Sequence, residues 1–448
     1  MANAGLKTSL NAIREISSEI YHRYIPEIDE DTDISRLSTP IFEVPEVYNE
    51  FCNALVNRIV YTQFENKAFR NPFVVLDGDQ IPLGYAGQEI YINPQKGRQF
   101  NVDDFAGLLV KYEADVKVQY QTINSDLQYP VTFTRQQLKK AFVSWGDLET
   151  FIDGLSNALY NGAYIDEYQK VKELVSGAYS MNIAQYTKVS AVSSAETGKA
   201  FVQAARELFL NFQTPTSKYN SWAKNGGEGR PIITWTNPED IVFIVRNDVR
   251  AALDVLVESM AFNIDKSTLL GNIMTVDDFT VYNDDGTVHY DGSDILGIIA
   301  DKRFFRIRRQ DMFMDSFYNP NNRTVQYYLN NIKMYGISMF ANHMVIALDD
   351  PEVAPTALKT DVTSVEVTVG STAEVKFETV PYAANGTITY SDGASGEFFT
   401  VAAKTGEPKT AVLTGVKAGN NKTLTATATN PSGETITKTV TVKVNAAS

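Results

Sequence analysis

Cysteine and histidine are scarce in this chain of 448 residues. A single cysteine, Cys52, excludes an intrachain disulfide and a zinc site built from cysteines, so we expect a reduced, partly buried thiol. His22, His289 and His343 lie far apart and share no spacing typical of a metal site or a catalytic triad. We therefore predict that each histidine is structural, and that the chain holds no metal and no cofactor.

Long apolar runs are also missing. No segment approaches the roughly 18 apolar residues that a membrane helix needs, and residues 1–10 lack the apolar core of a signal peptide. We expect a protein that is made and kept inside a cell, with no membrane partner. The length, together with a hydrophobic content of 44%, predicts two or more folded domains.

Basic runs are absent from a chain whose net charge is −14, and an acidic surface disfavours non-specific nucleic-acid binding. The nearest basic group comprises Arg303, Arg306, Arg308 and Arg309, which we interpret as structural or interface charges.

Signatures of catalysis are missing too. There is no Gly-x-Ser-x-Gly motif, and the glycine-rich loop at 225–229 lacks the Gly-Lys-Ser/Thr ending of a phosphate loop. Residues 283–286, Asn-Asp-Asp-Gly, could mimic a calcium loop. The spacing and the closing glutamate of an EF-hand are absent, however, so we predict a hairpin with an Asp-Gly turn. These absences favour a structural protein over an enzyme.

Composition changes abruptly near residue 351. From Pro355 to Ser448 there is no Arg, Trp, His, Cys or Met, and eight lysines balance eight acidic residues, so the charge of −14 resides on residues 1–354. Apolar residues alternate with polar ones around Val365, Val375, Ile388, Leu424 and Val440, and turn residues separate these stretches. This pattern predicts about seven short strands, which is typical of an immunoglobulin-like β-sandwich without its disulfide.

The remainder mixes helices and strands. An amphipathic stretch (Leu6, Leu10, Ile13, Ile16, Ile20) and an acidic run between Glu27 and Asp33 suggest an N-terminal arm. Extended segments within 68–134 suggest a projecting hairpin.

Apolar residues at three- and four-residue steps predict a helix from Asp147 to about Tyr179, with Ser144 and Asp147 as its N-terminal cap. About 30 residues would form a rod of roughly 45 Å. Residues 324–348 suit either central strands or a buried helix.

Three stretches resemble a known family. The first is Ile81-Pro82-Leu83-Gly84 followed by Glu89-Ile90-Tyr91. The second runs from Leu138 to Gly146 and on through 157–161 to 166–168, and the third comprises 261–263 and 270–272. In order and spacing over roughly residues 50–350 they closely resemble the major capsid proteins of phi-twenty-nine-like short-tailed bacteriophages. The C-terminal segment resembles a bacterial immunoglobulin-like domain of the second group, with Tyr390 where many members carry tryptophan.

The resemblance implies an α+β architecture, the Hong Kong ninety-seven fold of tailed-phage capsids. It implies an N-terminal arm (1–66), an extended E-loop (67–134), peripheral and axial domains with a long spine helix (135–350), a linker (351–355) and the all-β immunoglobulin-like sandwich (356–448). The implied contacts between subunits lie in the E-loop, with Ile81, Pro82, Leu83, Gly84, Glu89, Ile90 and Tyr91 as candidates.

The implied function is self-assembly into the icosahedral or prolate shell that encloses the phage genome. The implied partners are further copies of the chain in pentamers and hexamers, a scaffolding protein, a portal ring and double-stranded DNA enclosed without specific binding. Assembly would occur in the host bacterial cytoplasm. The alternative is a secreted or surface adhesin with an immunoglobulin-like module, which needs a signal peptide. A carbohydrate-active enzyme with such a module would also need paired catalytic carboxylates.

Overall fold

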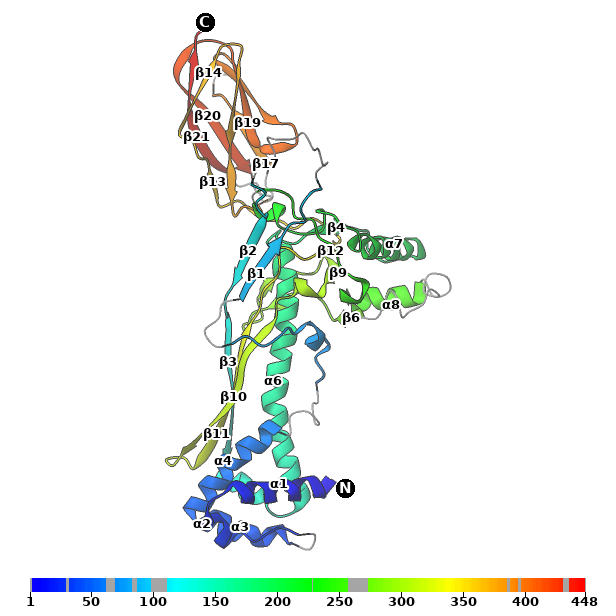
Figure 1. The fold of residues 1–448 in the computed structure, drawn as a ribbon, viewed down its shortest axis with the longest axis vertical. Coiled ribbons are helices and arrows are strands. Elements are labelled where there is room, and N and C mark those ends of the chain that lie inside the picture. Colours follow the sequence, from blue (N-terminus) through cyan, green and yellow to red (C-terminus); the bar gives the residue numbers. More distant parts are fainter. Residues whose placement is uncertain are drawn as a thin grey trace. The chain divides into compact units, whose positions relative to one another are not determined.

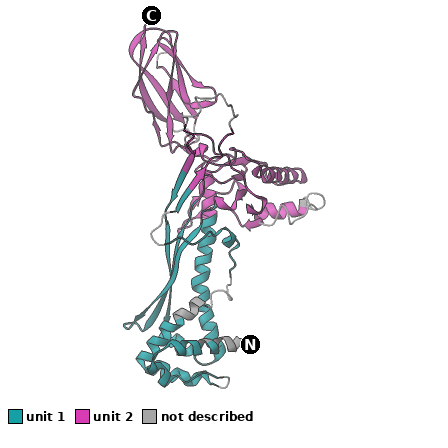
Figure 2. Cartoon of the chain, in the orientation of Figure 1, with its two compact units in different colours: residues 1–89, 118–171, 305–336 teal, residues 90–117, 172–304, 337–448 magenta. Residues whose placement is uncertain are grey.

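The chain forms two compact units, each assembled from segments that are far apart in sequence. The computed structural model describes residues 2–29, 32–61, 69–82, 87–97, 111–227, 229–256, 273–384, 387–393, 396–429 and 435–447. The first unit comprises residues 1–89, 118–171 and 305–336, and the second comprises 90–117, 172–304 and 337–448 (Figure 2). Both units therefore depend on contacts between residues hundreds of positions apart.

The first unit is rich in helices. Its helical elements before the long helix are α1 (Ala2–Ile16), α2 (Glu19–Tyr24), α3 (Ile34–Glu43), α4 (Pro45–Tyr61), the 3-10 turn η2 (Pro72–Leu76) and α5 (Arg135–Ala141). The predicted amphipathic stretch divides at the end of α1. Leu10 and Ile13 are buried in the core, whereas Ile16 and Ile20 are 69% and 45% exposed.

Helix α6 (Trp145–Ser180) is the predicted long helix. Its 36 residues correspond to about 54 Å at 1.5 Å per residue. Ser144 caps it as expected, because the Asp147 N–H donates to Ser144 Oγ (3.1 Å) and the Ser144 hydroxyl donates to the Asp147 carboxylate (2.7 Å). Leu155 and Leu159, two residues of the predicted stripe, are buried in the core of the first unit.

A sheet packs against this core, with β11 (Thr324–Met334) lying between β10 (Arg308–Asn319) and β3 (Ser125–Thr134) (Figure 1). Both pairings are antiparallel. Val325, Tyr327 and Leu329 alternate along β11 and are buried, so residues 324–334 form a strand rather than the alternative helix. The Tyr327 hydroxyl donates to the carbonyl of Cys52 (2.9 Å). Cys52 is buried more deeply than expected, which raises the pKa of its thiol to about 12.

The second unit is organised around a sheet in the order β4-β12-β9-β5-β6. These strands are β4 (Tyr186–Lys188), β5 (Ile241–Arg246), β6 (Ile273–Val276), β9 (Ile295–Asp301) and β12 (His343–Ala347). Every residue of β9 and β12 is buried, as expected for strands in the middle of a sheet. Apolar residues of α7 (Ala195–Phe212) and α8 (Asn247–Leu256) join one core cluster with this sheet. Short 3-10 turns lie at η4 (Ala223–Asn225), η5 (Pro238–Asp240) and η6 (Lys302–Phe304).

The aspartate-rich segment of this unit is a hairpin. Strands β7 (Val281–Tyr282) and β8 (Val288–Tyr290) pair antiparallel, and Gly286 between them has φ +81°, a conformation that favours glycine. The Asp285 carboxylate accepts hydrogen bonds from the backbone N–H (2.9 Å) and hydroxyl (2.6 Å) of Thr287, and these bonds lower its pKa. The prediction of an Asp-Gly turn is confirmed.

The C-terminal part is all β within its described residues. Its strands are β13 (Ala357–Lys359), β14 (Ser364–Thr368), β15 (Thr372–Lys376), β16 (Glu378–Val380), β17 (Thr387–Ser391), β18 (Phe399–Lys404), β19 (Glu407–Gly415), β20 (Gly419–Thr429) and β21 (Thr435–Asn445). One sheet has the order β14-β21-β20-β17 and another the order β15-β19-β18. The inward residues, among them Val367, Leu424 and Val442, form a separate core, where the Tyr390 ring lies 5.6 Å from that of Phe377.

Candidate assembly site

The first part of the candidate contact segment follows η2. The Ile81 N–H donates to the carbonyl of Arg309 (2.9 Å), and the Ile81 side chain is buried, whereas Pro82 is exposed. Leu83 and Gly84 lie outside the described residues. Ile81 therefore belongs to the interior of its own chain, whereas Pro82 is exposed at its surface.

The second part lies on β1 (Gly87–Ile92), which pairs with β2 (Val116–Gln121). The two faces of β1 differ. Glu89 and Tyr91 are partly buried, while Ile90 and Ile92 are 55% and 59% exposed. Because successive side chains of a strand point to opposite faces, the exposed isoleucines share one face.

The inward-facing residues of β1 are held by polar contacts. Glu89 forms an ion pair with Arg306. The Tyr91 hydroxyl donates to the carbonyl of Ile233, and its ring lies 5.7 Å from that of Phe340. These contacts fix which face of β1 points outward.

Asn93 anchors the end of this strand. It is buried, its Nδ2 donates to Asp115 Oδ2 (2.7 Å), and its Oδ1 accepts from the Ile233 N–H (3.1 Å). The bond from Asn93 lowers the pKa of Asp115, and Lys117 adds to this effect. A backbone bond from the Asn93 N–H to the Asp115 carbonyl (3.0 Å) brings the end of β1 to the start of β2.

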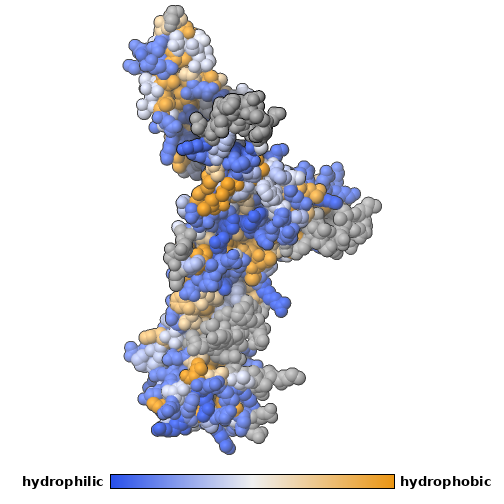
Figure 3. Space-filling view, in the orientation of Figure 1, coloured by the Kyte–Doolittle hydropathy of each residue, from blue (hydrophilic) through white to orange (hydrophobic). Residues whose placement is uncertain are grey.

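Strand β2 also carries exposed apolar side chains. Val116 and Tyr120 on β2 are 45% and 70% exposed, like Ile90 and Ile92 on β1. We call these four residues the hairpin face. Hydrophobic residues gather over this region in the space-filling view (Figure 3). A cluster of exposed apolar side chains is typical of a protein-protein contact.

A second apolar surface lies on β10. Phe313 and Phe317 are 41% and 55% exposed. Together with Asp315 between them they lie on the same face of the strand, because every second side chain points to that face. Opposite them on β11 are Asn330 and Gln326. In the sheet order, β10 has a neighbour on one side only, within the part of the chain that the structure describes.

A buried group of charges reinforces the first unit. Lys333 Nζ lies 2.8 Å from Glu167 Oε1 and 3.2 Å from Asp77 Oδ2, and the Lys333 side chain is 1% exposed. Glu167 Oε1 also accepts from Arg309 (3.2 Å) and from Asn331 Nδ2 (3.1 Å). Burial raises the pKa of Asp77 despite the neighbouring lysine. The group joins α6, β10, β11 and the end of η2.

No group of acidic, histidine or cysteine residues suited to a metal ion occurs among the described residues. The described helices also include none that is both apolar enough and long enough to span a membrane.

His343 Nε2 lies 2.7 Å from Ser221 Oγ, but both residues are completely buried. Nε2 accepts from the Gln185 N–H (3.1 Å), so Nδ1 carries the proton and donates to the Ala341 carbonyl (2.9 Å). Burial lowers the His343 pKa to about 4, which describes a neutral core histidine.

Comparison with known families decides the assignment. The model of the Phi29-like phage major capsid protein family matches residues 10–347, three quarters of the chain. The chain belongs to this family. It is therefore a capsid-forming structural protein of a bacteriophage virion, as the resemblance of residues 50–350 implied.

Individual relatives agree with this assignment. This capsid protein is 27% identical over 345 residues to the major capsid protein of Bacillus phage B103, covering 76% of this chain and 72% of that protein. It is 26% identical over 340 residues to the major capsid protein of Streptococcus phage Cp-1, covering 74% of this chain and 92% of that protein. The capsid structure of Staphylococcus phage Andhra shares its fold, with a TM-score of 0.52, 18% identity and coverage of 63% and 85%. The tailed-phage capsid fold is thus confirmed.

Of the four residues of the hairpin face, the sequence-based contact candidates include Ile90. They do not include Ile92, Val116 and Tyr120, which are also exposed. The spacing of Ile90 and Ile92, two residues apart, could have indicated one apolar face of a strand. It does not say which face is exposed, because either side of an isolated hairpin could face the core.

Proposed function

We propose that the capsid protein assembles its shell by placing the hairpin face, Ile90, Ile92, Val116 and Tyr120, on a neighbouring copy of the chain. This face belongs to the segment 67–134, which we assign as the E-loop. The single observation that carries the proposal is the exposure of these four apolar side chains, while Glu89 and Tyr91 on the other side of β1 are held by their own chain.

The candidate residues then divide into two roles. Ile90 and Pro82, with the undescribed Leu83 and Gly84, contact the neighbour. Ile81, Glu89 and Tyr91 position the hairpin, because their side chains are buried or bonded within the chain. Burying an isoleucine contributes about 1.5–3 kcal/mol. Contacts of this size are reversible one at a time and stable when many copies form them together.

Substitution of Ile92 by aspartate tests the proposal. Ile92 is exposed in the isolated chain, so Ile92→Asp should fold normally. In the proposed contact the aspartate would be buried among apolar side chains, which is costly, so the variant should fail to form shells. Val288→Asp is the matched control, because Val288 is a similarly exposed aliphatic residue on another hairpin, 53% against 59%. Sucrose-gradient sedimentation and electron microscopy would measure assembly, and thermal unfolding would verify folding. Normal shells from Ile92→Asp would refute the proposed contact.

We also propose that the C-terminal region is an immunoglobulin-like module on the outer surface of the shell. The family match ends at residue 347, ten residues before β13, and the all-β region has its own apolar core. The join at 351–355 would be the linker. An outer position also leaves the inner surface free for packaged DNA.

The remaining functional proposals follow from membership of the family. We assign the chain no enzymatic activity, and we propose pentamers and hexamers in an icosahedral or prolate shell. A scaffolding protein and a portal ring would assist assembly in the host bacterial cytoplasm. The net charge of −14 supports enclosure of double-stranded DNA without specific binding, because the wall would repel phosphate.

A further inference from the structure

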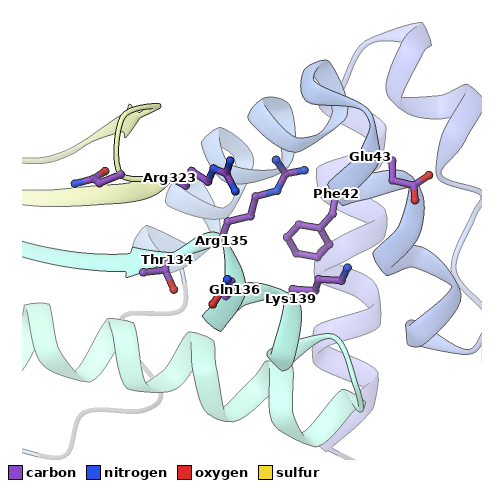
Figure 4. A pocket seen from close by; sticks show the side chains of 8 residues that line it. Phe42, Glu43, Thr134, Arg135, Gln136, Lys139 and Arg323 are labelled. Atoms are coloured by element: carbon purple, nitrogen blue, oxygen red, sulfur yellow. The ribbon is translucent and has the colours of Figure 1, made fainter.

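A basic pocket lies in the first unit where α3, α5 and the turn between β10 and β11 meet. It is a hollow of about 440 Å³ lined by Phe42, Glu43, Thr134, Arg135, Gln136, Lys139, Asn322 and Arg323 (Figure 4). Arg135 and Lys139 are four residues apart on α5 and therefore share one face of the helix. Arg323 comes from the turn, so three cations border the pocket against one carboxylate, that of Glu43.

The pocket is held in shape by contacts within the chain. The Arg135 N–H donates to the carbonyl of Arg323 (3.1 Å), which ties the start of α5 to the turn. The Arg135 guanidinium lies 5.0 Å from the centre of the Tyr48 ring and 5.9 Å from that of Phe42. Thr134 and Gln137 form a capping box at the start of α5. The cations are thus arranged before any partner binds.

The charges of this pocket are not neutralised within the described residues. None of Arg135, Lys139 and Arg323 forms an ion pair there, whereas other basic groups of the first unit, such as Lys333 and Arg306, are paired. Neighbouring like charges repel one another, and an anionic partner would relieve this repulsion. The chemistry of the pocket fits the carboxylates of an acidic peptide segment.

The same chain carries such a segment. Residues 27–33 contain five acids in seven positions, and Glu27, Asp29 and Asp33 are exposed. This acidic run precedes α3, while Phe42 and Glu43 of the pocket lie at the other end of that helix. The ten helical residues of α3 place the start of the helix, which follows the run, about 15 Å from the end that borders the pocket.

We propose that the basic pocket binds the acidic run, residues 27–33, of a second copy of the chain. Complementary surfaces at opposite ends of one helix generate head-to-tail contacts, which close into rings or extend into lattices. The inference rests on the capsid-forming function and adds a charged contact that is separate from the hairpin face. Its strength should fall as the salt concentration rises, because exposed charges are screened.

Charge reversal within α5 tests the proposal with a matched control. Lys139 and Lys140 are adjacent and exposed, but only Lys139 lines the pocket. Lys139→Glu should lower the yield of shells by roughly tenfold or more, since juxtaposed like charges across an interface cost several kcal/mol. Lys140→Glu makes the same change in net charge and should assemble like the wild type. Thermal unfolding would be measured for both, and Lys139→Gln should show a smaller loss of yield in the same direction.

A compensating change identifies the partner. The double variant Glu27→Lys with Glu30→Lys reverses the charge of two acids of the run. By itself this double variant should reduce assembly, whereas its combination with Lys139→Glu should restore shells. If Lys139→Glu assembles normally, or if Lys140→Glu fails equally, the pocket is not a contact site. Absence of rescue would mean that another anionic partner occupies the pocket, which also overturns the proposal. Wild-type chain that forms no shells under these conditions would instead count against the assembly function itself.

Discussion

Lys333 Nζ on β11 and Glu167 Oε1 on α6 lie 2.8 Å apart, with both side chains at most 5% exposed. The pair joins the long helix to the middle strand of the sheet in the first unit. Arg309 and Asn331 also donate to Glu167, so this carboxylate is surrounded by donors. Removing one member leaves the other charge buried without its main partner, which costs more than the pair itself contributes.

Replacement of Lys333 by methionine should therefore destabilise the first unit by about 3–5 kcal/mol. The double variant Lys333→Met with Glu167→Met should recover part of this loss, because the Glu167 carboxylate is then no longer buried without its lysine. Recovery should be incomplete, because Asp77 still lacks its Lys333 partner. Urea unfolding of unassembled protein, followed by tryptophan fluorescence, would measure both, and exposed Lys140→Met serves as the control. A lysine variant as stable as the wild type would show that the pair contributes little.

The buried stripe of α6 makes a second prediction. Leu159 is 1% exposed in the core, whereas Ile165 on the same helix is 47% exposed. Leu159→Ala should lower the free energy of unfolding by about 2–5 kcal/mol, because it leaves a cavity, and Ile165→Ala should cost far less. Equal effects in chemical unfolding would mean that the stripe does not face the core.

The third prediction concerns acid stability. The His343 pKa falls from 6.5 to about 4 in the folded chain, so the unfolded chain binds the proton first as the pH drops. The contribution of neutral His343 to the free energy of unfolding is therefore fully present above pH 6.5. It declines between pH 6.5 and 4, by about 3 kcal/mol in total. Unfolding measured across this range should show a weaker pH dependence in His343→Gln than in the wild type. Identical slopes would contradict a neutral buried histidine.

The C-terminal region provides the fourth prediction. Residues 355–448 have their own apolar core and, expressed alone, should unfold cooperatively as a β protein. A chain truncated after Val353 should still form closed shells of unchanged diameter, measured by electron microscopy. An unfolded fragment, or loss of shells on truncation, would show that the region is integral to the wall.

Several elements of this fold were predictable because their pattern is local. The apolar stripe and the Ser144 cap identify α6, and period-two alternation identifies β14, β20 and β21. Turn chemistry at Gly286 predicts the β7–β8 hairpin. In each case, neighbouring residues alone determine hydrogen bonding and the direction of the side chains.

By itself, the sequence determined the family, the long helix, the all-β C-terminal region and the absence of a disulfide. The tertiary structure alone decided which residues of the candidate segment are buried and which are exposed. Ile81 and Ile90 are both isoleucines of the same segment, yet Ile81 is buried beside β10 and Ile90 is exposed. Likewise, Arg135, Lys139 and Arg323 form one pocket only because a turn some 180 residues away meets α5. Burial and convergence depend on packing between distant segments, and no local pattern encodes that packing.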